Sequence, residues 1–152
     1  MSDFLLGFVV IVLMVTLVAC GVLGDTIVAP ADEELSVTRG STDISLLPLT
    51  LTYTVSDASN RDITVSASVG IGTPVADAKL SIQGGDLGTA GWTLLIEGSA
   101  SAGSVTLKSL IVEDGSITDI KFQLDATNVN AGAGNLGTQW TYTVTYTIAL
   151  TL

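Results

Sequence analysis

The sequence predicts an N-terminal hydrophobic α-helix followed by an all-β sandwich of immunoglobulin-like or jelly-roll type. Three observations predict this fold class: an uncharged apolar run over residues 4–24, alternation of apolar and polar residues from residue 35 onward, and turn-forming clusters between the alternating segments. A chain of 152 residues has room for one such domain. We therefore expect a transmembrane-type helix over residues 1–24, a linker over 25–34 and a β-sandwich domain over 35–152.

The apolar run reads FLLGFVVIVLMVTLVACGVLG. About 20 residues in a helix span the hydrocarbon core of a bilayer. Apolar side chains would occupy every face of this helix, so we expect it in a membrane or among copies of itself rather than on a surface. The side chains expected to pack between helices, which we call the assembly helix, are Phe4, Leu5, Phe8, Val12, Val15, Val18 and Val22.

Three interpretations of the apolar run compete. A secretory signal should begin with basic residues, whereas Met1, Ser2 and Asp3 come first here. A lipoprotein signal is indicated by Leu17-Val18-Ala19-Cys20-Gly21, which resembles a lipobox and would place an acyl chain on Cys20; the alternative is a small buried cysteine in a helix. The third interpretation keeps the helix in the mature protein, and the missing basic region favours it.

The β domain is predicted from period-two alternation, clearest over residues 49–55, where apolar residues fall on one face and threonines on the other. The segment before it, with Pro30 and three consecutive acidic residues, is expected to be an acidic hinge. Asp114-Gly115 predicts a hairpin between two strands. The last strand is expected to bend through the middle of a sheet, and pairing with a neighbouring subunit is the alternative. The predicted strands are 35–39, 49–55, 63–69, 78–82, 92–97, 104–113, 117–124 and 139–152.

Composition argues against several classes of function. The net charge is −10 with only five basic residues and no basic cluster, which disfavours nucleic acid and anionic lipid as partners. The chain has no histidine, so histidine catalysis and histidine metal ligation are excluded, and its single cysteine cannot form an intramolecular disulfide. No base is available to activate a serine or threonine. We expect no enzyme activity, no catalytic residue and no cofactor.

Two patterns suggest ligand binding and have simpler interpretations. The glycine-rich run over residues 130–137 lacks the lysine and the strand–loop–helix context of a phosphate loop, so a plain loop is favoured. Glu113, Asp114, Asp119 and Asp125 are oxygen donors of the kind that Ca²⁺ prefers, but their spacing matches no EF-hand. Turn-forming roles are favoured for these carboxylates, and we expect no metal site.

An uncharged leading helix followed by a Thr- and Gly-rich β head resembles the layout of processed archaeal type IV pilins and archaellins. The resemblance covers the helix and the general architecture. The bacterial pilin pattern has a Glu at the fifth mature position, where this chain has Leu5. We consider that Asp3 substitutes by pairing with the α-amino group of Met1 of a neighbouring subunit, and the alternative for Asp3 is a helix N-cap.

The resemblance implies a structural subunit of an extracellular, pilus-like filament, in which hydrophobic helices form the core and β domains the outer surface. Its partners would be copies of itself in a helical homopolymer, with membrane insertion before assembly and a final place at the cell surface. No small-molecule substrate is expected. The alternatives are a single-pass membrane-anchored surface or virion protein with a β-sandwich head, and a lipoprotein acylated at Cys20.

Overall fold

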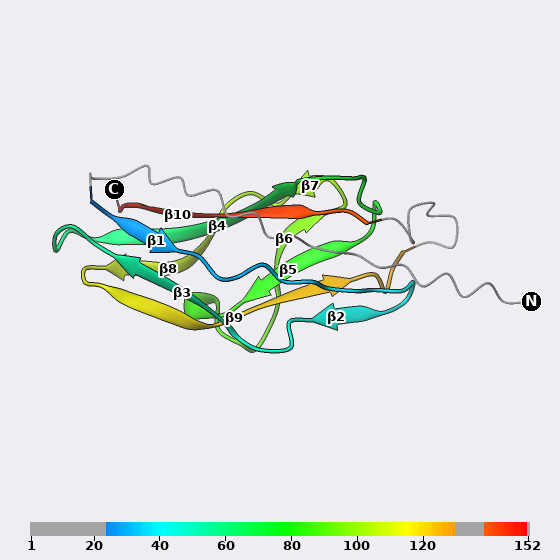
Figure 1. Ribbon diagram of the computed structural model, residues 1–152, viewed down its shortest axis with the longest axis horizontal. Helices are drawn as coiled ribbons and strands as arrows, with labels where there is room; N and C mark the ends of the chain where they lie inside the picture. Colours follow the sequence, from blue (N-terminus) through cyan, green and yellow to red (C-terminus); the bar gives the residue numbers. More distant parts are fainter. Residues whose placement is uncertain (1–23, 130–138, 152) are drawn as a thin grey trace, which may run out of the picture.

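The computed structural model describes residues 24–129 and 139–151, which form two antiparallel sheets around one core (Figure 1). The larger sheet has the order β1 (Thr26–Val28), β3 (Leu49–Thr54), β9 (Gly115–Asp125), β5 (Lys79–Gln83), β6 (Thr93–Glu97) and β7 (Ala100–Ser101), and β2 (Thr42–Ile44) also pairs with β9. The smaller sheet has the order β10 (Tyr142–Leu150), β4 (Arg61–Val69) and β8 (Val105–Ile111).

Alternation along the strands builds the core, as the sequence predicts. In β3 the side chains of Leu49, Leu51 and Tyr53 are buried, and the intervening threonines are exposed. β10 repeats this pattern, because every second residue from Tyr142 to Ile148 points inward. Successive side chains of a strand point to opposite faces, so these sequences place an apolar face of each sheet against the other sheet.

The predicted fold class is wrong as a whole. The described residues are all-β, and their longest helix is the three-residue 3₁₀ turn η1 (Gly85–Leu87). Within these residues, no helix is long and apolar enough to cross a membrane. The helix expected over residues 1–24 lies outside the described part of the chain except for Gly24, which is in a turn. Seven strands beside three also match neither the seven-stranded immunoglobulin arrangement nor an eight-stranded jelly roll.

Seven of the predicted strands overlap β3, β4, β5, β6, β8, β9 and β10. The strand predicted over residues 35–39 is wrong: Leu35 and Val37 are buried, but their backbone joins no sheet. Three short strands were not predicted, namely β1, β2 and β7. β1 lies within the linker expected over residues 25–34. The first part of this linker is therefore a strand of the larger sheet, paired with β3.

The Asp114-Gly115 hairpin is also wrong. β8 pairs with β4 and β9 pairs with β3, so this turn carries the chain from one sheet to the other. The glycine is needed because Gly115 lies opposite Tyr53 in the ladder, and a Cβ atom there would come within 2.6 Å of the Tyr53 hydroxyl.

The expectation of a central final strand is wrong as well. β10 pairs with β4 alone and forms an edge of the smaller sheet, in the part of the chain that the structure describes. Its side-chain pattern holds to Ile148, and Leu150, at 41% exposure, has left the core.

Candidate functional site

Every residue proposed above as a site lies outside the described residues. This applies to the assembly helix (Phe4, Leu5, Phe8, Val12, Val15, Val18 and Val22), to the charge pair of Met1 and Asp3, and to the lipidation candidate Cys20. The glycine-rich run over 130–137 also lies outside them. These predictions therefore stay predictions.

Three of the four carboxylates considered for Ca²⁺ accept separate hydrogen bonds. Asp114 accepts a hydrogen bond from the Val55 amide at 2.8 Å, and Asp119 accepts one from the Gly85 amide at 2.9 Å. Asp125 accepts from the amide and the hydroxyl of Thr127, at 2.8 and 2.6 Å. Across residues 24–129 and 139–151, no three acidic or cysteine side chains gather as a metal site would require.

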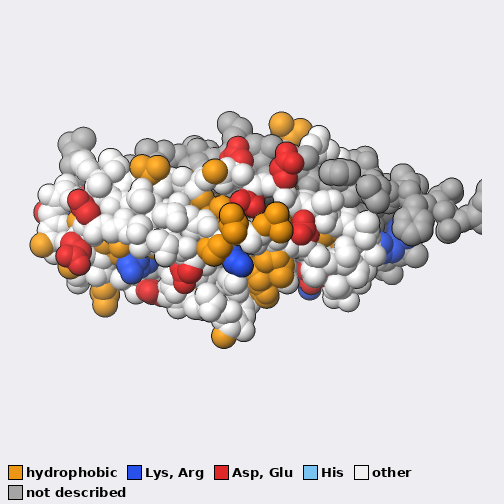
Figure 2. Space-filling model, turned by 60° about the horizontal axis from the view of Figure 1, so that its bottom comes forward, with side chains coloured by type: hydrophobic (Ala, Val, Ile, Leu, Met, Phe, Trp, Pro, Cys, Tyr) orange, Lys and Arg blue, Asp and Glu red, His pale blue; other side chains and the backbone are white. Residues whose placement is uncertain are grey.

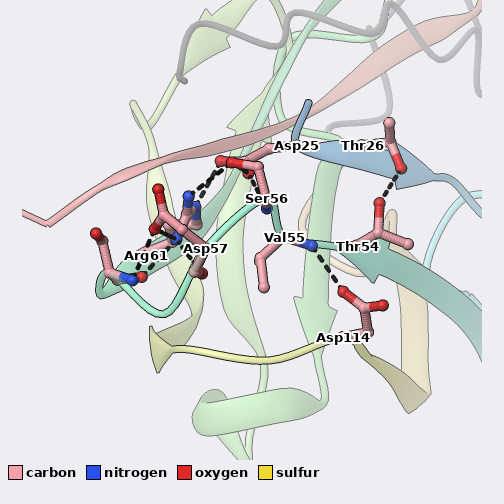
Figure 3. A network of polar contacts seen from close by, with 9 residues as sticks. Asp25, Thr26, Thr54, Val55, Ser56, Asp57, Arg61 and Asp114 are labelled. Carbon is pink, nitrogen blue, oxygen red and sulfur yellow. Dashed lines mark hydrogen bonds and ion pairs between the residues drawn. The ribbon is translucent and has the colours of Figure 1, made fainter. Parts of the chain in front are cut away.

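The best-defined polar site is a buried ion pair directly after the apolar segment (Figure 3). Arg61 donates from Nε to Oδ2 of Asp25 at 2.5 Å, and the two side chains are only 0% and 1% exposed. Arg61 opens β4 in the same phase as the core residues Ile63 and Val65, so alternation directs its side chain inward. A buried guanidinium requires a carboxylate and a full set of hydrogen bonds.

The remaining guanidinium donors of Arg61 are satisfied by the β3–β4 turn. Nη1 donates to the carbonyl oxygens of Asp57 and Ser59, at 2.9 and 2.6 Å, and Nη2 donates to the Ser56 hydroxyl at 3.2 Å. Nη1 also lies 3.0 Å from the carboxylate of Asp57, which is 48% exposed. The turn is therefore folded around the arginine rather than merely adjacent to it.

Asp25 connects this arginine to the start of the domain. Its Oδ1 accepts hydrogen bonds from the amide and the hydroxyl of Ser56, at 2.8 and 2.9 Å. The preceding residue, Gly24, has a φ of +120°, and a Cβ atom there would lie 3.1 Å from Cβ of Ser56. One residue later, the hydroxyls of Thr26 and Thr54 share a hydrogen bond of 2.6 Å across the β1–β3 ladder. We call Gly24, Asp25, Ser56 and Arg61 the junction.

The electrostatics of the junction favour the charged pair. Burial by itself raises the pKa of Asp25, but hydrogen bonds from Arg61 and Ser56 outweigh it, and the pKa ends below its ordinary value of 3.8. The hydrogen bond to Asp25 raises the pKa of Arg61. The backbone amide of Ser59 and the nearby Arg61 lower the pKa of Asp57 to about 2. The junction therefore has a structural role: its two ionised groups bind each other and hold the start of β1 against the β3–β4 turn.

Sequence reasoning missed the junction, although one signal was present. Arg61, Ile63, Val65 and Ala67 alternate in one phase, which places an arginine on the core side of a strand. Such a residue demands a buried acidic partner. The sequence does not identify that partner, because Asp25 lies 36 residues earlier, at the start of the expected linker over residues 25–34.

The face of the described domain in Figure 2 shows no large patch of one charge. On the face in Figure 2, uncharged atoms dominate and the Lys and Arg side chains lie apart from one another. Lys79 pairs with Glu97 across β5 and β6 at 3.7 Å, with both side chains more than one-third exposed. Exposed ion pairs of this kind contribute little to stability.

Comparison with protein-family models, with curated proteins and with solved structures finds no match to this chain. The resemblance to archaeal type IV pilins and archaellins therefore stays a prediction.

Proposed function

We propose that this chain is a structural subunit of an extracellular, pilus-like filament, with the apolar segment over residues 4–24 in the interior of the assembly and the β domain on its outside. The segment carries no charge. Burying each of its larger side chains is worth about 1.5 to 3 kcal/mol, which gives a large driving force for association between copies. Before assembly the same segment would reside in a membrane, and the assembled subunit would lie at the cell surface.

The observation that carries the proposal is the junction. A subunit of a regular polymer must hold its outer domain in one orientation relative to its inner segment, because every copy occupies an equivalent position. Here the last residue of the apolar segment, Gly24, lies so near Ser56 that a Cβ atom on it would come within 3.1 Å of the Ser56 Cβ, and the next residue, Asp25, is bound to Arg61. A head that only displays a binding surface on a membrane works equally well on a mobile tether. The hydrogen bonds that fix Asp25 directly after the segment therefore favour the filament over a membrane-anchored surface or virion protein.

The first test is electron microscopy of the full chain after detergent removal. We expect unbranched filaments of uniform diameter. Discrete particles or rosettes of heads would refute the proposal and support a membrane anchor. Intact mass of the native protein tests the lipoprotein alternative, because an acyl adduct on Cys20 would assign the segment to a signal that is removed.

The second test uncouples the junction without changing either part. Inserting a flexible four-residue Gly/Ser sequence between Gly24 and Asp25 keeps the apolar segment and the ion pair but frees their relative orientation. We expect filaments to be lost or irregular, with unchanged thermal stability of the β domain. The control is the same insertion after Gly88, in the exposed loop before β6, where assembly should persist. Normal filaments from the junction insertion would show that a fixed orientation is not required.

A further inference from the structure

The loop that joins β2 to β3 presents two adjacent leucines to solvent (Figure 1). Leu46 is 93% exposed and Leu47 is 73% exposed. The start of the loop is fixed by Ser45, which is buried: its amide donates to the Phe122 carbonyl at 3.0 Å, and its hydroxyl accepts from the Phe122 amide at 3.0 Å. The other end is fixed by Leu49, which is buried in the core. A loop held at both ends loses little conformational entropy when its leucines become covered.

The outer surface of β1 and β3 carries no charge. Cross-strand partners share one face of a sheet, and the outward residues of these two strands are four threonines and a valine. Val28 is 65% exposed. The hydroxyls of Thr26 and Thr54 bond each other at 2.6 Å, which lowers the cost of removing water from this surface. These residues, which we call the uncharged strip together with the two leucines of the loop, are Thr26, Val28, Thr50, Thr52 and Thr54.

One basic side chain lies at the base of the loop. Ser45 bonds Phe122, and Leu49 pairs with Ile120. Lys121 lies between these two partners and is therefore beside the loop, and the alternation in β9 directs its side chain outward. Within residues 24–129 and 139–151, Lys121 forms no ion pair. Such a lysine can lie along an apolar surface with its stem while its ammonium group reaches a phosphate of a lipid headgroup.

The uncharged strip starts where the apolar segment ends. Gly24 is the last residue of the uncharged run over residues 4–24, and Val28 follows four residues later. β1 runs antiparallel to β3, so Gly24 lies near Ser56, just beyond the end of β3, and Leu47 lies nine residues before Ser56 in the chain. At about 3.4 Å per residue, this separation is roughly 30 Å along the larger sheet. A bilayer that receives the segment therefore meets both leucines when the larger sheet lies along its surface.

We propose that, before assembly, the uncharged strip lies on the surface of a zwitterionic bilayer, with Leu46 and Leu47 among the acyl chains and Lys121 at the level of the phosphates. The inference rests on the proposed function, in which the segment over residues 4–24 resides in a membrane before assembly. A chain of net charge −10 is repelled by anionic lipid, whereas a zwitterionic surface has no net charge to oppose it. Burial of the two leucines holds the β domain against the membrane.

Thiol labelling in a bilayer tests this contact. The full Cys20→Ser chain, with either Leu47→Cys or Ile71→Cys, is placed as a single copy in phosphatidylcholine nanodiscs. Ile71 is the matched control, because it is 74% exposed and follows β4 at the end remote from Arg61 and the junction. A charged, membrane-impermeant maleimide should label Leu47→Cys about tenfold more slowly than Ile71→Cys, since burial of the remaining Leu46 favours the covered state by about this factor. Each rate is divided by that of the same variant unfolded in urea. Equal normalised rates would overturn the proposal.

Labelling of assembled filaments distinguishes lipid from a neighbouring subunit as the cover of the strip. We expect Leu47→Cys to be slow already in single-copy nanodiscs, where lipid is the cover. Fast labelling in nanodiscs together with slow labelling in detergent-free filaments would refute the lipid contact and assign the strip to an interface between subunits.

Methyl NMR gives a second test that leaves the strip unchanged. Lipids with a nitroxide on the acyl chain should broaden the methyl resonances of Leu46 and Leu47 and leave those of Ile71 unchanged. Sharp resonances from both leucines would refute insertion. The two proposals fail separately: filaments in electron micrographs together with sharp leucine resonances would refute the lipid contact alone, whereas broadened leucines in a chain that forms no filaments would refute the filament alone.

Discussion

Replacing Asp25 with alanine is expected to destabilise the β domain by about 3 kcal/mol. Removing one partner of a buried ion pair costs about 3 to 5 kcal/mol, because the other charge stays buried and unpaired. We take the lower value because the carboxylate of Asp57 also lies close to the same guanidinium. Against a typical stability of about 5 to 15 kcal/mol, this is a large share of the total.

The assay is urea unfolding of the detergent-solubilised full chain, followed by tryptophan fluorescence, since Trp140 is fully buried. With a slope of about 2 kcal/mol per molar urea, a loss of about 3 kcal/mol lowers the midpoint by about 1.5 M. The control is Asp57→Ala, which removes the half-exposed partner of the same arginine and should shift the midpoint far less. A shift for Asp25→Ala no larger than that for Asp57→Ala would refute the assignment of Asp25 as the main partner of the arginine.

The same pair makes stability depend on acid pH. The pKa of Asp25 is lower in the folded state than its ordinary value of 3.8, so the folded state favours the ionised form. Its contribution is present above about pH 4 and is lost as pH falls through the folded-state pKa. We expect the unfolding midpoint of the native chain to fall in this range more steeply than that of Asp25→Ala. Parallel pH profiles would show that the carboxylate is not favoured by folding.

Three further perturbations probe the core. Gly115→Ala should cost about 1 to 3 kcal/mol, because the new Cβ meets Tyr53, whereas Gly91→Ala, with no atom within 4 Å, should be neutral in the same urea assay. Tyr142→Phe should cost about 1 kcal/mol through the lost 3.0 Å hydrogen bond to the Gly98 carbonyl, while Tyr146→Phe should be neutral or stabilising, since its buried hydroxyl has no partner in the described structure. Burial raises the pKa of Tyr142 to about 12, so stability should be complete below about pH 10 and decline as pH rises toward 12, in step with tyrosinate absorbance.

The long strands could be predicted from the sequence because alternation reports burial directly. Leu49, Leu51 and Tyr53 mark one face of β3 without reference to any other segment. The short strands could not be predicted in this way. β1 and β2 are held by β3 and β9, so their extended form depends on partners distant in the chain. A strand was wrongly predicted over residues 35–39, because alternation reports burial and not strand pairing. Leu35 and Val37 pack into the core, but their backbone joins no sheet.

Pairing was less predictable than strand location. Asp114-Gly115 predicts a turn, but it does not show whether the strands on either side of the turn pair with each other. The chain uses this turn to change sheets, and the Asp114 carboxylate then binds the Val55 amide. The residues of the final strand were likewise predicted, but its position in the sheet was not. The alternation of its side chains is the same for a central strand and for an edge strand. The junction was predictable in part. The alternation in β4 indicates that the Arg61 side chain points inward, but it does not identify Asp25 as its partner.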